Sequence, residues 1–362
     1  MGIKIVHAGD FHIGVSLSHL GTNTGKMRSD EIRQALKRTV EFCKENSVDA
    51  LIITGDLFDN FKATKADSEF VKNTLSSLSP INAYIICGNH DYMCADSPYA
   101  KENYFSDNVH IFPCYESSFE IPEKNTVLWG KSYDKASTEP SFDSCVFDEN
   151  KINILLLHGD MTEGSSFNII SKSTLSSIPA AYAAFGHIHA GEVFSAGNVK
   201  CAYCGTPEGH SFKDNGATGI ICAEISESET KIEQIDFSLR KYHTISFDIT
   251  GKTEQDIING VKSLTNPMDF FSVTFTGEYS ESSAPDISYI QDLLSKDLHY
   301  IEIADDSFPG YDLDAIEQEE SLRGAFLREL RETTASEEEF ARAAKIGLDA
   351  LGGRLPDLGG VE

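Results

Sequence analysis

The sequence has no apolar run long enough to cross a membrane as a helix, which takes roughly 20 residues. Its longest apolar stretches, such as residues 152–157, have the length of strands. The first residues carry a single lysine and a short apolar run, which predicts a first strand and not a signal peptide. We therefore expect a cytoplasmic protein that makes no membrane contact.

The cysteines form no recognisable disulfide or zinc-binding pattern. Eight cysteines are scattered over 362 residues, a distribution typical of reduced thiols in a large intracellular chain. Cys201 and Cys204 form a lone C-x-x-C, whereas a structural zinc site needs a second pair of ligands. We interpret both cysteines as strand residues.

Positive charge is scarce. The chain has 30 Lys and Arg against 57 Asp and Glu, for a net charge of −27. A protein that binds DNA unaided is normally basic, because affinity comes largely from contacts to phosphates. Any nucleic-acid binding would therefore need metal ions or a basic partner. The same acidic charge favours solubility and the capture of cations.

The first half of the chain does contain a regular alternation of strand and helix patterns. Apolar residues at helical spacing predict helices beginning at Ser29 and covering 66–78. The resulting βαβαβ order predicts a parallel sheet with crossover helices, and hence an α/β fold. The strands we expect are 3–8, 50–54, 83–87, 109–112, 117–121, 126–131, 152–157, 181–185 and several within 192–238.

A chain of 362 residues is longer than one compact domain usually needs. We expect a first domain over residues 1–240, a small α/β domain over 241–304 and an acidic helical segment over 305–362. Helices at 319–332 and 336–351 would carry apolar stripes in this last segment. Such stripes usually pack against the chain's own domain. The more specific alternative is that they bind in an apolar groove of a partner.

Five short segments place metal-ligand residue types directly after apolar strands. Five of the eleven histidines lie in them. In open α/β sheets, sites form beyond the carboxyl ends of the strands, so these segments can converge on one crevice. The segments are Asp10-Phe11-His12, Gly55-Asp56-Leu57-Phe58-Asp59, Gly88-Asn89-His90-Asp91, His158-Gly159 and Gly186-His187-Ile188-His189.

The residue types in these segments suit a two-metal phosphoesterase. Such a site needs a carboxylate that can bridge both ions, which together clamp the attacking and leaving oxygens of a phosphate ester. Mixed oxygen and nitrogen ligands suit Mn, Fe or Zn more than Ca. The D-x-H and H-x-H patterns put two ligands on one side of an extended chain end. Each segment alone is weak evidence, and the ordered set is what predicts the site.

The ordered set resembles the calcineurin-like metallophosphoesterase superfamily, and within it the DNA-repair exonuclease branch that contains the Mre11 and SbcD nucleases. The resemblance covers roughly residues 1–240. Three stretches carry the similarity to that branch, namely residues 5–14 (IVHAGDFHIG), 55–59 (GDLFD) and 203–207 (YCGTP). Residues 205–219 resemble the bacterial members of the branch.

The resemblance implies a role for each residue. Asp10, His12 and His189 would hold one metal ion, and Asn89, His158 and His187 the other. Asp56 would bridge both ions. His90 would face the scissile phosphate, and Asp91 would orient His90 or a ligand. Asp59 stands where archaeal and eukaryotic members have a histidine, so no role of that histidine carries over.

One further histidine is a candidate for the site from its position alone. His210 lies in the loop 205–210, shortly after the last metal motif, where we expect it to face the substrate. The other five histidines are interpreted as surface or packing residues, namely His7, His19, His110, His243 and His299.

The resemblance also implies an architecture and partners. The fold would be a four-layer α/β/β/α sandwich, with residues 241–304 as a DNA-facing cap. The C-terminal helical segment would dock onto an SMC-like ATPase of the SbcC or Rad50 type, which could supply the missing basic surface. Homodimers are common in the branch. The metals would be two divalent ions, Mn²⁺ first, with Fe, Zn, Ni and Mg left open.

Three functions remain open from the sequence. The leading one is a Mn²⁺-dependent DNA exonuclease and endonuclease that uses a two-metal mechanism. The second is a phosphodiesterase for a small ester such as a cyclic nucleotide, which the acidic charge mildly favours. The third is a non-catalytic metal-binding scaffold for an ATPase, which would predict a missing ligand or a missing His90, and every expected position is filled.

Overall fold

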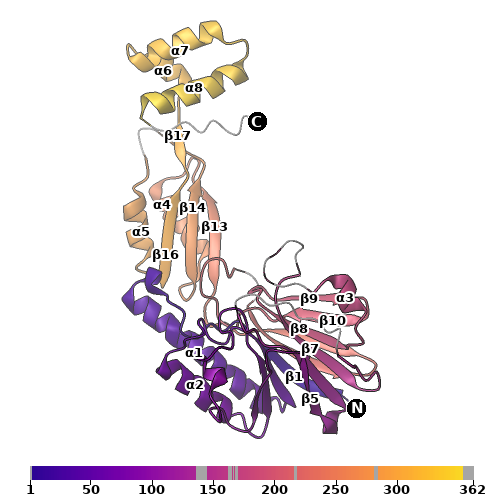
Figure 1. Cartoon of the computed structure of the whole chain (residues 1–362). Helices are drawn as coiled ribbons and strands as arrows, with labels where there is room; N and C mark the ends of the chain where they lie inside the picture. Colours follow the sequence, from indigo (N-terminus) through magenta and orange to yellow (C-terminus); the bar gives the residue numbers. More distant parts are fainter. Residues whose placement is uncertain are drawn as a thin grey trace. The chain divides into compact units, whose positions relative to one another are not determined.

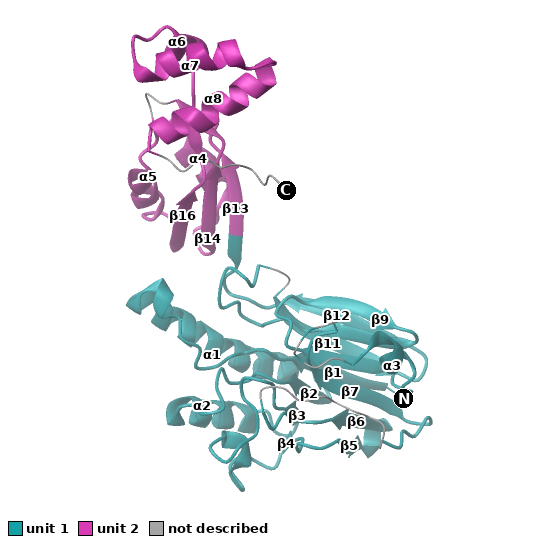
Figure 2. Cartoon of the chain, turned by 45° about the horizontal axis from the view of Figure 1, so that its top comes forward, with its two compact units in different colours: residues 1–243 teal, residues 244–362 magenta. Residues whose placement is uncertain are grey.

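The computed structural model describes residues 2–135, 145–161, 165, 167, 170–215, 218–280 and 284–353. The chain forms two compact units, residues 1–243 and 244–362 (Figure 2). Among the described residues, no helix is both long enough and apolar enough to span a membrane.

The first unit contains a six-stranded sheet in the order β12-β11-β1-β2-β3-β4 (Figure 2). The strands β1 to β4 run parallel, and β11 and β12 extend the sheet by antiparallel pairing. The parallel part is the sheet that the βαβαβ pattern predicts. The strands are β1 (Gly2–Ala8), β2 (Ala50–Thr54), β3 (Asn82–Ile86), β4 (Val109–Ile111), β11 (Gly219–Ser226) and β12 (Thr230–Asp236).

A second six-stranded sheet has the order β5-β6-β7-β8-β10-β9. Its four central strands are parallel, and the edge strands β5 and β9 are antiparallel to their neighbours. The strands are β5 (Ser117–Ile121), β6 (Thr126–Gly130), β7 (Ile152–His158), β8 (Tyr182–Gly186), β9 (Glu192–Ala196) and β10 (Val199–Tyr203).

Alternating side chains of the two sheets build the core between them. Ile52 and Ile86 of the first sheet and Ile154 and Leu156 of the second belong to one buried cluster. Side chains on the other face of β7 and β8, such as Leu155, pack in a second cluster with the short helix α3 (Lys172–Ser176). The helices α1 (Thr22–Glu45) and α2 (Lys65–Ser76) lie along the outer face of the first sheet (Figures 1 and 2). The fold is therefore the expected four-layer α/β/β/α sandwich.

Helix α1 begins seven residues earlier than the sequence predicts, at Thr22 and not at Ser29. The additional turns bury Gly25 and Arg28, neither of which has the apolar character that marks a helix face in a sequence. A side chain at Gly25 would lie 2.5 Å from the backbone oxygen of Leu17, so only glycine lets the two segments approach this closely.

The second unit begins within β13 (Tyr242–Asp248) and contains the three-stranded sheet β13-β14-β16. Helices α4 (Glu254–Leu264) and α5 (Ile287–Leu294) cover it, with Ile257, Ile290 and Phe275 in a shared core. Two short strands that the sequence does not predict, β15 (Glu278–Ser280) and β17 (Phe308–Gly310), pair in parallel. The remaining strands are β14 (Phe270–Thr276) and β16 (Tyr300–Asp305).

The C-terminal part of this unit is a small helical cluster. Helix α6 (Leu313–Glu317), which the sequence does not predict, joins α7 (Leu322–Thr333) and α8 (Glu337–Leu351). Leu327, Phe340 and Leu348 share one buried core, so the apolar stripes of the predicted helices pack on each other. The last nine residues of the predicted segment 305–362 lie outside the described residues.

Three short 3₁₀ helices complete the described elements. They are η1 (Ser18–Leu20), η2 (Pro98–Ala100) and η3 (Pro122–Lys124).

A buried ion pair fastens the loop after β10 to helix α1. The Arg28 guanidinium has no exposed side-chain surface and donates to the Glu208 carboxylate at 2.8 Å and to the backbone oxygen of Gly209 at 2.6 Å. Glu208 also accepts from the backbone N–H groups of Leu239 and Arg240. The loop that carries His210 is therefore held from two sides.

We expect Arg28→Ala to lower the free energy of unfolding by about 3–5 kcal/mol, because it leaves the buried Glu208 carboxylate without its main countercharge. Lys231→Ala is the matched control, since Lys231 is 67% exposed and pairs with Glu229 at the surface, where such pairs contribute about 0–1 kcal/mol. Chemical denaturation of both variants measures the difference. Equal losses would mean that the buried pair adds no stability.

Candidate metal centre

The candidate site lies where the carboxyl ends of both sheets meet. Segments after β1, β2 and β3 come from the first sheet, and segments after β7 and β8 from the second. Backbone hydrogen bonds tie the segments together: the N–H of Asp10 donates to the oxygen of Gly55, and that of His12 to the oxygen of Asp56. All five segments that the sequence singles out therefore converge.

Several of these residues adopt an unfavourable backbone conformation. Seven residues other than glycine have a positive φ among the described residues, and four of them are Asp10, His12, Asp56 and His187, with φ of 51°, 48°, 50° and 90°. Such conformations cost of the order of 1–3 kcal/mol each and persist only where surrounding contacts impose them. The strain is concentrated at the candidate site, which is typical of functional centres.

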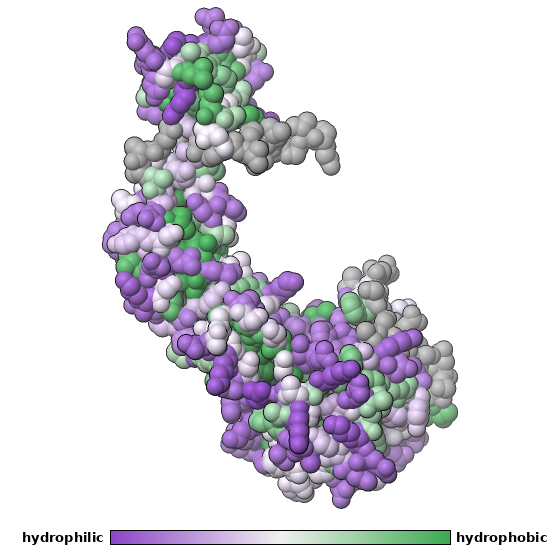
Figure 3. Space-filling model, turned by 60° about the vertical axis from the view of Figure 1, so that its left-hand side comes forward, coloured by the Kyte–Doolittle hydropathy of each residue, from purple (hydrophilic) through white to green (hydrophobic). Residues whose placement is uncertain are grey.

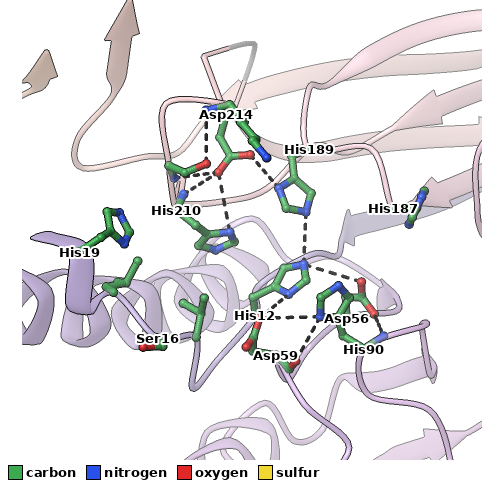
Figure 4. Close-up of a pocket in the computed structure, with 14 residues that line it drawn as sticks. His12, Ser16, His19, Asp56, Asp59, His90, His187, His189, His210 and Asp214 are labelled. Carbon is green, nitrogen blue, oxygen red and sulfur yellow. Dashed lines mark hydrogen bonds and ion pairs between the residues drawn. The ribbon is translucent and has the colours of Figure 1, made fainter. Parts of the chain in front are cut away.

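The first group of side chains consists of Asp10, His12 and His189, which can each offer a ligand atom within 4.8 Å of the others. Asp10 has no exposed surface, and its two carboxylate oxygens accept from the backbone N–H of His187 at 3.0 Å. The Nε2 atoms of His12 and His189 are 3.2 Å apart (Figure 4). We call this group cluster 1.

The second group consists of Asp56, His158 and His187, again within 4.8 Å, together with Asn89. The Asn89 Oδ1 atom lies 2.8 Å from Nε2 of His158 and 3.1 Å from Nδ1 of His187. We call Asn89, His158 and His187 cluster 2. The side chains that the resemblance assigns to two metal ions are thus brought together in the two expected sets.

Asp56 stands between the clusters. Its Oδ2 atom is 3.4 Å from Nε2 of His158 and 3.7 Å from Nε2 of His12. The other oxygen accepts from the backbone N–H of His90 at 2.9 Å, which fixes the carboxylate in place. The position is the one that a bridging ligand requires.

The carboxylates make the centre attractive to cations. Burial lowers the pKa of His12, but hydrogen bonding to Asp59 and the charges of Asp56 and Asp10 outweigh burial and raise it to about 9. Burial also lowers the pKa of His158, but the charge of Asp56 and a hydrogen bond to it outweigh burial and raise this pKa to about 9. A field that holds protons on two buried imidazoles would also hold divalent cations, whose binding displaces such protons.

The hydrogen-bonding pattern gives an independent test of fit. The Nδ1 atoms of His12 and His189 each face a carboxylate to which they can donate, so the Nε2 atoms of the two rings point at each other. The space between these two nitrogens can hold a proton, or a metal ion that displaces it. A shared ion at about 2.1 Å from each nitrogen would place them about 3.0–3.4 Å apart. The observed 3.2 Å agrees, and the oxygen and nitrogen donors fit a transition metal.

Two further predicted site residues, His90 and Asp91, lie at the surface and at the base of the site, respectively. The side chain of His90 is 45% exposed and faces the pocket, with its Nδ1 donating to the backbone oxygen of Asp59 at 3.1 Å. Asp91 is buried, and its carboxylate accepts from the backbone of Leu57 and Gly88 at 2.9 and 2.7 Å and from the Tyr99 hydroxyl at 2.7 Å. Asp91 therefore holds the backbone that carries Asp56, and no described contact joins it to the imidazole of His90.

The remaining predicted residue, His210, lies against cluster 1. Its ring centroid is 5.1 Å from that of His12, and its Nε2 donates to the backbone oxygen of Phe11 at 3.2 Å. His210 is largely buried but contributes to the pocket wall. A contact with substrate stays a prediction.

The sequence gives no sign of two carboxylates that contact the expected ligands. Asp59 lies 3.2 Å from Nδ1 of His12, and Asp214 lies 2.8 Å from Nδ1 of His189. Asp59 belongs to a quoted motif, but no pattern pairs it with His12. Asp214 follows His189 by 25 residues and lies in the quoted stretch 205–219, but no pattern pairs it with His189, so only the folded loop reveals the contact.

An open pocket of about 470 Å³ gives access to the clusters (Figure 4). It is lined by His12, Val15, Ser16, Leu17, His19, Asp56, Asp59, His90, His187, His189, His210, Ser211, Lys213 and Asp214.

Gly55 offers a sharp test of this packing. It has φ of +91°, and a side chain there would lie 2.4 Å from Nδ1 of His158. We expect Gly55→Ala to displace His158 and weaken metal binding at cluster 2, as measured by a Mn²⁺ titration. Gly21→Ala is the matched control, because Gly21 has φ of +79° with no atom within 4 Å of the added carbon. The control keeps the strain without the clash and should bind metal normally. Metal binding by Gly55→Ala equal to that of the control would contradict the assignment of His158.

Curated relatives share a low identity with this chain. It is 23% identical over 255 residues to the uncharacterized metallophosphoesterase YhaO of Bacillus subtilis (strain 168). The match covers 64% of this chain and 59% of YhaO, so this chain spans less than two thirds of that relative's length. It is also 23% identical over 280 residues to the D subunit of the nuclease SbcCD of the same organism, covering 63% of this chain and 68% of that protein.

Solved structures show a distant likeness. The protein TT1561 of Thermus thermophilus matches with a TM-score of 0.43 and 10% identity, over 65% of this chain and 99% of that one. A dimetal phosphatase from Danio rerio matches with a TM-score of 0.40 and 10% identity, over 64% and 98% respectively.

A family model gives the clearest assignment. The model for calcineurin-like phosphoesterases matches residues 3–191, more than half of the 362 residues. That range includes every strand end that contributes to the two clusters. The chain belongs to the calcineurin-like phosphoesterase family, whose members hydrolyse phosphoester bonds.

Proposed function

We propose that the protein hydrolyses phosphodiester bonds of DNA with the help of two divalent cations, Mn²⁺ being the first choice. The observation that supports this most strongly is the placing of Asp56 between two sets of ligand-type side chains. One shared carboxylate between two clusters suits two ions that act on the same phosphate. Asp10, His12 and His189 would hold one ion, and Asn89, His158 and His187 the other.

The chain's own residues would complete the chemistry. When bound, the two cations supply Lewis acidity that neutralises phosphate charge and makes water more acidic. His90 lies on the pocket wall with its Nδ1 engaged by a backbone oxygen, so its Nε2 can face the substrate. In its protonated form His90 would donate to a phosphoryl or leaving oxygen. The contacts of Asp91 would keep Asp56 in register beneath the substrate.

The choice of DNA as the substrate draws on the similarity to the D subunit of the nuclease SbcCD. The motifs at residues 5–14, 55–59 and 203–207 favour the same branch. Residues 241–304 would serve as a DNA-facing cap. The net charge of −27 favours a different substrate, a small phosphodiester such as a cyclic nucleotide, which needs no extended basic surface.

One assay separates these substrates. We expect Mn²⁺-loaded protein to cleave linear duplex DNA, and Asp56→Asn to reduce the rate by at least about 100-fold, because the variant loses the shared charge of both metal positions. Cyclic nucleotides and a bis-aryl phosphodiester are offered in parallel. Products are followed by gel electrophoresis and chromatography.

The matched control for this assay is Asp297→Asn, which removes an exposed carboxylate that pairs with Lys262 in the second unit. It should leave the rate unchanged. Turnover of the small esters alone would replace the DNA proposal with the small-substrate one. If the protein binds two metal ions but turns over none of these substrates, the result would favour the non-catalytic scaffold.

We also propose that the C-terminal helical cluster docks onto an SMC-like ATPase. Leu322 at the start of α7 is 71% exposed and Leu351 at the end of α8 is 44% exposed. Figure 3 shows apolar residues gathered on this cluster with hydrophilic residues around them. Exposed apolar groups on a helical surface suit a partner's apolar groove. A basic ATPase would also offset the acidic charge of this chain.

We expect removal of residues 311–362 to abolish co-purification with a co-expressed SbcC-type ATPase, while Mn²⁺ binding stays intact. Leu322→Asp should weaken the association without truncation, because it places a charge in the apolar contact. Pull-down and calorimetric titration give the two readouts. Undiminished co-purification of the truncated chain would place the docking surface elsewhere.

A further inference from the structure

The two clusters differ in what lies behind their histidines. In cluster 1, both rings are backed by a carboxylate: Asp59 Oδ1 lies 3.2 Å from Nδ1 of His12, and Asp214 Oδ1 lies 2.8 Å from Nδ1 of His189. The rings are therefore held with Nδ1 protonated and Nε2 turned to the shared point between them (Figure 4). Each carboxylate adds negative charge to the imidazole it contacts.

In cluster 2, the oxygen behind the His158 ring carries no charge. The Nδ1 atom of His158 donates to the backbone oxygen of Thr54 at 2.7 Å. The Nδ1 atom of His187 and the Nε2 atom of His158 both face Oδ1 of Asn89, at 3.1 and 2.8 Å, so these three atoms lie on the metal side of the cluster. The amide of Asn89 also replaces the carboxylate that Asp10 provides in cluster 1. Cluster 2 therefore has an uncharged oxygen behind His158 and an amide among its own donors, where cluster 1 has carboxylates in both places.

Asp214 is built into its position and is not a chance surface contact. It is 7% exposed, and its second oxygen accepts from the backbone N–H groups of His210 and Ser211 at 2.8 and 3.0 Å. These bonds stop the carboxylate from rotating away from His189. The loop is in turn anchored through Glu208 and Arg28, so the distance from Asp214 to His189 is set by the fold.

A carboxylate behind a histidine fixes the tautomer and raises the basicity of the nitrogen that binds metal, and its loss typically costs about 10- to 100-fold in metal affinity. Two such carboxylates and Asp10 surround cluster 1. Coulomb attraction for a divalent ion is correspondingly stronger there than at cluster 2.

We propose that Asp214 and Asp59 are positioning residues that make the metal centre unequal, so that cluster 1 binds its ion first and tightly while cluster 2 holds an exchangeable ion. This inference rests on the dinuclear site proposed above. An exchangeable ion beside Asn89 would make full loading depend on the metal concentration, and activity would follow the filling of cluster 2.

The test is a titration of chelator-stripped full-length protein with Mn²⁺ alone, followed by calorimetry and electron paramagnetic resonance. The wild-type protein should show a tight and a weak binding event. Asp214→Asn should weaken the tight event by about 10- to 100-fold and leave the weak event unchanged. Asn89→Ala should weaken the weak event and leave the tight event unchanged. Asp214→Glu, which restores a carboxylate, should recover part of the tight affinity.

Asp59→Asn provides a second variant in case Asp214→Asn fails to fold, which thermal unfolding in chelator reveals. Asp297→Asn controls for loss of charge alone. One class of equivalent sites, or equal weakening of both events by Asp214→Asn, would overturn the inference and leave the dinuclear site standing. Binding of fewer than two ions by the wild-type protein would overturn both.

Discussion

The Asp56 carboxylate is the point on which the rest of the site depends. It lies within 3.7 Å of one histidine from each cluster, at a place where ends of strands from both sheets meet. A buried carboxylate in this position is costly unless positive charge surrounds it. In the protein alone that charge comes from protons on His12 and His158, whose pKa values are both raised to about 9 by neighbouring carboxylates. The same arrangement is suited to divalent ions.

Backbone strain accompanies this concentration of charge. Asp10, His12, Asp56 and His187 all have positive φ, and surrounding hydrogen bonds hold them there. Asp91 contributes most plainly, since one carboxylate accepts from the backbone N–H groups of two site segments and from a tyrosine hydroxyl. The two packed sheets supply the stability that offsets this cost.

More of the candidate site could be predicted from the sequence than of the fold's details. The segments containing Asp10, Asp56, Asn89, His158 and His187 are local patterns at strand ends, and parallel strands necessarily bring such ends to one edge. The start of α1 could not be predicted, because Gly25 and a buried Arg28 do not look like a helix face in a sequence. The short pair β15 and β17 carries too few residues for a pattern.

The sequence by itself determined which residue types stand at which strand ends, and hence the kind of chemistry, because strand periodicity and motif order are local properties. Only the tertiary structure decided which carboxylate lies behind which histidine. Asp214 reaches His189 because a loop anchored by Arg28 and Glu208 folds back over the site. Such contacts join residues far apart in the chain, and their distances are set by packing that no local pattern encodes.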